Sequence, residues 1–181
     1  YWNRIYSAGH ATPWELKGLG DAETTATISW NVSGGGAGSG MGNNTGDYRL
    51  LLNDGTVVTA PCTFTFSGLI PGRYQVYSYV LDRREGFVSP ARVTVLGAQT
   101  PVQYSGQGSM PGNAFIEGVT HSIHDLEILG NTFAVTVENV NAGPPDTTAT
   151  GFQLVHSPVP EPSTWLILCL GTLAFTRFRR S

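Results

Sequence analysis

Alternation of apolar and polar residues with a period of two is the feature that most restricts the fold of this chain. It is clearest in residues 25–32, where Ala26, Ile28, Trp30 and Val32 take every second position. Because successive side chains of a β-strand point to opposite faces, this run predicts a strand with one buried and one exposed face. No amphipathic helical pattern of comparable clarity precedes residue 158.

Further candidate strands follow along the chain, separated by turn signals. They cover residues 48–52, 56–59, 62–66, 73–81, 91–96, 120–128, 132–137 and 151–155. Asn53-Asp54-Gly55 predicts a hairpin turn, and Gly130-Asn131 predicts another. The 23 glycines and 11 prolines also favour turns and short strands over helices. We therefore expect an all-β fold, a two-sheet antiparallel sandwich of the jelly-roll type. It occupies an ectodomain of residues 1–157, with the sheets running from about Ala22 to Val155.

The apolar faces of these strands define a predicted core. It contains Ile28, Trp30, Leu50, Leu52, Phe64, Phe66, Val76, Phe133, Val135, Val137 and Phe152. Cys62 shares the parity of Phe64 and Phe66, so we expect it to be a small buried residue rather than half of a disulfide with Cys169.

Three stretches rich in glycine, serine or proline are expected to be loops: residues 33–46, 105–113 and 141–148. The first contains Gly34-Gly35-Gly36, but it lacks the Gly-Lys-Ser/Thr ending and the following helix of a phosphate-binding loop. We interpret it as a connection between strands.

Residues 158–181 form a separate tail with three parts in order. Pro160-Glu161-Pro162 is stiff and extended, because each proline fixes its own φ and restricts the residue before it. An uncharged run, residues 164–176, then predicts one hydrophobic helix, although thirteen helical residues reach only ~20 Å against a hydrocarbon core of ~30 Å. Its apolar residues are Trp165, Leu166, Ile167, Leu168, Leu170, Leu173 and Phe175. Arg177, Arg179 and Arg180 follow, and they favour retention beside a cytoplasmic leaflet.

This order of elements resembles the PEP-CTERM sorting signal of Gram-negative bacteria. The resemblance implies export and recognition near Pro160, Glu161 and Pro162 by an exosortase, a membrane-embedded enzyme. It also implies that the helix and the arginines hold the precursor in the membrane before delivery to the cell surface or extracellular matrix. The alternative is an ordinary single-span anchor with prolines in its stalk.

Residues 66–79, together with the closing residues 151–155, resemble the galactose-binding-like jelly rolls of many surface proteins. This resemblance implies a fold rather than a ligand. Alternation places Arg73, Gln75, Tyr77 and Tyr79 on one face of their strand, where tyrosine rings could stack against sugars. The alternative is that the sheet is covered on both faces and these tyrosines pack.

The sequence gives little support for a metal site, a catalytic site or a nucleic-acid-binding surface. His121 and His124 lie three positions apart on a strand, so their rings should point to opposite faces and no metal site is expected. No Gly-x-Ser-x-Gly elbow is present and no carboxylate pair stands out, so we predict no catalytic residues, no enzyme activity and no cofactor. Residues 1–162 carry seven basic and thirteen acidic side chains, a net charge of −6, which argues against nucleic acid as a partner.

Three functions remain, in order of preference. The first is an exported, non-catalytic surface or matrix protein whose partners are an exosortase-type enzyme and the membrane. The second is a carbohydrate-binding module that uses the aromatic strand face (Tyr77, Tyr79) or loops at one rim of the sandwich, with extracellular polysaccharide as its partner. The third is a small hydrolase. An exported protein of this kind is expected to be made with a secretory leader. Because the chain begins at Tyr1, we expect either that a leader was removed or that the sequence is a fragment.

Overall fold

The computed structural model describes residues 10–18, 22–31, 37–39, 54–82, 86–109, 111–112, 114–141 and 147–157. These residues form strands β1 (His10–Lys17), β2 (Glu23–Asn31), β3 (Ala37–Ser39), β4 (Asp54–Val58), β5 (Cys62–Ser67), β6 (Gly72–Leu81), β7 (Ala91–Val95), β8 (Val102–Ser105), β9 (His121–Ile128), β10 (Phe133–Asn139) and β11 (Thr147–Ser157). Within these ranges, no helix is long and apolar enough to cross a membrane. The predicted hydrophobic helix falls outside them.

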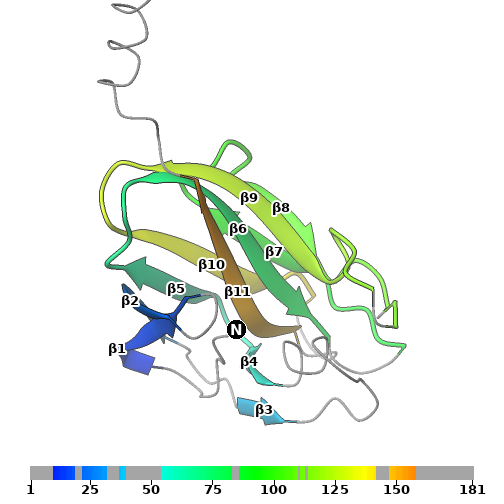
Figure 1. Cartoon of the computed structure of the whole chain (residues 1–181). Helices are drawn as coiled ribbons and strands as arrows, with labels where there is room; N and C mark the ends of the chain where they lie inside the picture. The colour runs from blue at the N-terminus through cyan, green and yellow to red at the C-terminus, as the bar shows by residue number, and fades with distance from the viewer. Residues whose placement is uncertain are drawn as a thin grey trace, which may run out of the picture.

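The strands form two antiparallel sheets (Figure 1). The first has six strands in the order β1-β2-β5-β10-β7-β8, and the second has five in the order β3-β4-β11-β6-β9. Every described pairing between neighbouring strands is antiparallel. This confirms the all-β, two-sheet class expected from the alternation.

Aromatic rings join the two sheets in the core. Phe66 of β5 stacks on Phe133 of β10 with ring centroids 4.8 Å apart, within the six-stranded sheet. Phe152 of β11 reaches across from the five-stranded sheet and lies 4.8 Å from Phe64 and 5.4 Å from Phe66. Such tilted and stacked arrangements add to the free energy of burial.

Most of the predicted core is confirmed. Eight of its members are buried: Ile28, Trp30, Phe64, Phe66, Val76, Phe133, Val135 and Val137. Phe152 is partly buried and packs against them. Leu50 and Leu52 lie outside the described residues. Cys62 is buried and free, as its parity predicted.

Several predicted boundaries are wrong. The sheets begin at His10 rather than near Ala22, because β1, which contains Pro13 and has no regular alternation, pairs with β2 at a sheet edge. The predicted loops 33–46 and 141–148 each contain strand residues, namely β3 and the start of β11. Strand β8 was not predicted at all.

The predicted turn Asn53-Asp54-Gly55 is also wrong, because Asp54 and Gly55 belong to β4. A Cβ atom on Gly55 would lie 2.7 Å from the carbonyl oxygen of Ala149 in β11. The glycine therefore serves a close approach between two paired strands rather than a turn.

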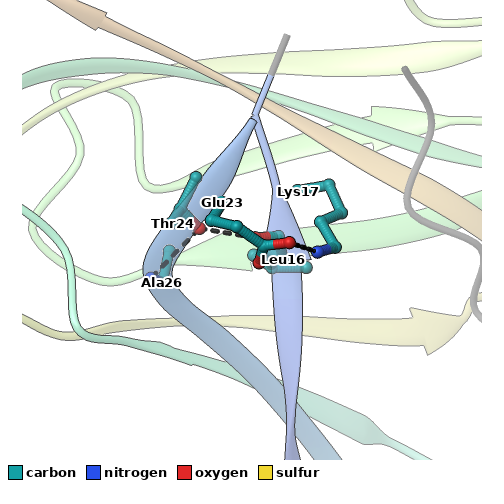
Figure 2. A network of polar contacts seen from close by, with 5 residues as sticks. All are labelled: Leu16, Lys17, Glu23, Thr24 and Ala26. Carbon is teal, nitrogen blue, oxygen red and sulfur yellow. Dashed lines mark hydrogen bonds and ion pairs between the residues drawn. The ribbon is translucent and has the colours of Figure 1, made fainter. Parts of the chain in front are cut away.

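The β1–β2 hairpin is held by local polar contacts (Figure 2). Lys17 pairs with Glu23, the hydroxyl of Thr24 donates to the carbonyl of Leu16, and the amide of Ala26 donates to Thr24 Oγ1 at 3.2 Å. These exposed contacts fix the hairpin geometry while adding little to the free energy of folding.

One end of the sandwich, here called the tail end, gathers the last described residue and three turns. Ser157 pairs with Arg73 at the start of β6, and Gly72 pairs with Ile128 at the end of β9. The β5–β6 and β9–β10 turns are joined by a hydrogen bond from the Leu69 amide to the Asn131 carbonyl at 3.1 Å. The β7–β8 turn lies at the same end, because the amide of Gln99 donates to the carbonyl of Asp125 at 2.9 Å. Figure 1 shows β11 ending beside the start of β6 and the end of β9.

Candidate functional site

The outer face of the five-stranded sheet carries the residues predicted to bind sugar. Strand β6 lies between β11 and β9, and its register places Tyr77 between Gln153 and Ile123, and Tyr79 between Gly151 and His121. On the opposite face of β6, Tyr74, Val76, Ser78 and Val80 are buried. The predicted division of β6 into two faces is therefore confirmed.

Tyr77 is half-buried and belongs to a short polar chain on this face. Its hydroxyl donates to Gln75 Oε1 at 2.5 Å, and Gln75 Nε2 donates to Asp125 Oδ1 at 3.2 Å. Arg73 is exposed two residues further along the same face of the strand. The arrangement offers a ring edge, an oriented amide, a carboxylate and a guanidinium along one row of the sheet surface.

Tyr79 does not present an open ring beside Tyr77. It is 5% exposed, because Phe115 from the β8–β9 connection contacts it edge-on at 5.7 Å and His121 lies at 5.3 Å. Its hydroxyl donates to Gln153 Oε1 at 3.2 Å. Burial, with a smaller contribution from Tyr77, raises the pKa of Tyr79 to about 12. Tyr79 therefore packs against other side chains, which is the alternative to sugar binding considered for this face.

The two histidines of β9 face opposite sides of the sheet, as their spacing predicted. His121 lies on the outer face beside Tyr77 and Tyr79, with Nδ1 3.0 Å from the hydroxyl oxygen of Thr120. Burial lowers the pKa of His121, and the carboxylate of Glu117 opposes that shift. Within the described part of the chain, no three histidine, cysteine or acidic side chains gather in a group that could hold a metal ion.

His124 points into the sandwich, into a polar cluster that the sequence analysis missed. The register sets His124 opposite Val76 and sets Ser122 opposite Ser78 on the same inner face. The imidazole nitrogens and both serine hydroxyls are buried. The serine hydroxyls make no hydrogen bond within the described residues, and the imidazole has at most a weak one to the Val93 backbone. Burial lowers the pKa of His124 against smaller opposing effects of the Val93 backbone and Asp125. The parity of Ser122, His124 and Leu126 was the available signal.

The thiol of Cys62 is expected to be unreactive in the folded chain. Its thiol lies 3.2 Å from the carbonyl oxygen of Asn31, to which it donates. Burial raises the pKa of Cys62 to about 12, so the reactive thiolate is scarcely populated at neutral pH.

The tail residues expected to carry sorting lie outside the described residues. They are Pro160, Glu161, Pro162, the apolar residues of 164–176, and Arg177, Arg179 and Arg180. Strand β11 is paired with β6 up to Ser157, so the tail begins where sheet pairing ends.

Comparison with known proteins supports one part of this description, the tail. Residues 158–180 match the PEP-CTERM protein-sorting motif. The chain thus consists of an all-β sandwich followed by a sorting motif, which implies an exported protein with a C-terminal membrane anchor. No curated protein matches the chain.

Among solved structures, the chain is similar to one described as the structure of TmCBM61 in complex with beta-1,4-galactotriose. The two are 12% identical, and the similarity covers 73% of this chain and 88% of that chain with a TM-score of 0.33. A likeness this distant carries no argument about ligand or site.

Proposed function

We propose that this protein is an exported, non-catalytic surface or extracellular-matrix protein of a Gram-negative bacterium, processed at its C-terminus by an exosortase-type membrane enzyme. The observation that carries the proposal is the match of residues 158–180 to the sorting motif, directly after a strand that ends at Ser157. The sandwich of residues 1–157 is the cargo, and residues 158–181 are the signal.

Each part of the tail has a distinct role in this proposal. Pro160, Glu161 and Pro162 form the recognition element, because prolines keep the segment out of regular helices and central strands. The apolar residues 164–176 hold the precursor in the membrane, and Arg177, Arg179 and Arg180 keep its end beside the cytoplasmic leaflet. A span that is short for a bilayer suits a temporary anchor.

The test is expression of the full precursor in a host with and without its exosortase, followed by mass measurement of the released protein. We expect loss of the segment beyond the motif only when the enzyme is present. Changing Pro160 and Pro162 to Ala should abolish this processing, whereas Pro158→Ala, which leaves Pro160-Glu161-Pro162 unchanged, should preserve it. Release of a protein that retains Trp165 to Ser181, or normal sorting of the double variant, would refute the proposal.

A second candidate function is carbohydrate binding by the outer face of the five-stranded sheet. The row formed by Arg73, Gln75, Tyr77 and Asp125 favours it, because an aromatic ring beside oriented polar groups suits a sugar ring and its hydroxyls. Tyr79 would contribute indirectly, by fixing Gln153 and His121 under the cover of Phe115.

Glycan-array binding of the full chain tests this candidate. Tyr77→Ala should weaken any binding by roughly two- to twelve-fold, which corresponds to ~0.5–1.5 kcal/mol for one aromatic contact. Tyr104→Ala is the control, since Tyr104 is an exposed tyrosine in β8 of the other sheet. Equal binding by both variants would exclude the outer face as the sugar site.

A further inference from the structure

The most exposed apolar side chains gather at the tail end. Among the described residues, Leu129, Leu96 and Ile70 are the most exposed large hydrophobic side chains, at 86%, 79% and 64%. They occupy the β9–β10, β7–β8 and β5–β6 turns, which all lie at the end where β11 finishes. Single exposed hydrophobic residues are ordinary on protein surfaces, but a group of the three most exposed ones at one end indicates a candidate contact surface.

These turns are fixed in position by hydrogen bonds. The Tyr74 hydroxyl donates to the carbonyl of Ile70 at 2.7 Å, and the Leu69 amide donates to the Asn131 carbonyl. In the β7–β8 turn, the Val95 amide donates to the Pro101 carbonyl at 2.8 Å. Turn tips commonly carry small or polar residues, whereas each of these three hydrogen-bonded turns exposes a large aliphatic side chain.

The tail places this surface close to a membrane. Only residues 158–163 separate Ser157 from the apolar run, and six residues span at most ~20 Å when fully extended. If residues 164–176 are in the bilayer, the tail end is the part of the sandwich nearest the lipid headgroups. Such a tether gives the turns a high effective concentration at the membrane surface.

We propose that the tail end of the sandwich rests on the membrane that holds the precursor, with Ile70, Leu96 and Leu129 inserted at the level of the lipid headgroups. The bound partner is a lipid bilayer surface. The three turns supply the apolar contact, and the exposed Arg73 at the start of β6 lies at the same end, where it can meet lipid headgroups. The contact orients the sandwich until the tail is cleaved, after which the turns alone are a weak membrane anchor. The inference rests on the proposed membrane-held tail.

The test uses the full chain in vesicles of phosphatidylethanolamine and phosphatidylglycerol, with an environment-sensitive fluorophore on one cysteine and spin-labelled lipids as quenchers. Labelled Cys169 reports on the tail, since the buried Cys62 thiol reacts poorly. In a Cys169→Ser background, Leu129→Cys reports on the tail end. Val140→Cys is the matched control, because Val140 is an aliphatic residue, 51% exposed, that follows β10 at the opposite end.

The expected result is strong quenching at position 169 by acyl-chain labels, and quenching by headgroup labels that is several-fold stronger at position 129 than at position 140. Replacing Ile70 and Leu96 with Gln should reduce quenching at position 129, whereas Val140→Gln should leave it unchanged. Equal quenching at positions 129 and 140, with position 169 still quenched, would overturn the inference and leave the anchored tail intact. Absence of quenching at position 169 would overturn the anchored tail itself.

Discussion

Acidification should destabilise the sandwich through His124. The imidazole is 0% exposed, and a weak contact with the Val93 backbone only partly offsets the effect of burial on its pKa. Burial lowers the pKa of His124 below the ordinary value of ~6.5 that it regains in the unfolded chain. Below that value the unfolded chain binds a proton that the folded chain does not, so the free energy of unfolding falls as the pH falls.

The magnitude follows from this linkage. While His124 stays neutral in the folded chain, the free energy of unfolding falls by up to ~1.4 kcal/mol for each pH unit below the unfolded pKa of this residue. Between about pH 7.5 and about pH 5.5 the free energy of unfolding then falls by at most ~1.4 kcal/mol, the limit for a ring that stays neutral in the folded chain. The pKa of His121 is also lowered by burial, so this residue further lowers the free energy of unfolding as the pH falls.

Urea denaturation at both pH values, with the chain in mild detergent, measures the effect. His124→Phe should lose less stability than the wild type over this interval, by up to ~1.4 kcal/mol, because a planar aromatic ring remains and the titrating group is removed. Val58→Ala is the control: Val58 is fully buried in β4, which β11 and β6 separate from β9, so its cavity should cost the same at both pH values. A His124→Phe variant with the wild-type pH dependence would refute the assignment.

Three further predictions concern the core and the turns. Phe64→Ala and Phe133→Ala should each lower the free energy of unfolding by ~3–5 kcal/mol, and wild-type denaturation midpoints would show that the core is misassigned. Gly68→Ala should lower the free energy of unfolding more than Gly97→Ala in the same assay. Both glycines have positive φ, but a Cβ at Gly68 would lie 2.0 Å from a backbone oxygen, whereas a Cβ at Gly97 would have no atom within 4 Å. Equal costs would contradict this packing. Cys62 should react with a thiol reagent only after unfolding, and rapid labelling of the folded chain would show that it is accessible.

The sequence predicted the strands in which alternation is strict. Strands β2, β5, β6 and β10 have one apolar face, and that local pattern is enough to place Ile28, Phe64 and Val135 in the core. The pattern fails at the sheet edges. Strand β1 contains a proline and β8 has only 4 residues, so both depend on pairing with a neighbour for their extended conformation.

At the candidate site, too, local alternation predicted the faces of the strands but not the contacts made by distant residues. Alternation placed Tyr77 and Tyr79 on one face, and it placed His121 and His124 on opposite faces. It could not predict that Phe115, far along the chain from Tyr79, would cover that ring. Nor did it identify the buried polar cluster of His124 and its neighbours, because a face shared by two strands is visible only once their register is known.

The pairing of β11 also constrains how the sorting signal can work. The strand is hydrogen-bonded to β6 from Thr148 to Ser157, so drawing the tail further into a membrane would require stripping β11 from the five-stranded sheet. Phe152 and Leu154 would lose their core contacts in the process, at a cost comparable to a large share of the stability of a small domain. If residues 164–176 lie in the bilayer as proposed, residues 158–163 limit the distance between the folded sandwich and the membrane to no more than ~20 Å. An enzyme that recognised Pro160-Glu161-Pro162 would then have to work within that gap, close to the lipid headgroups and to the exposed turns of the tail end.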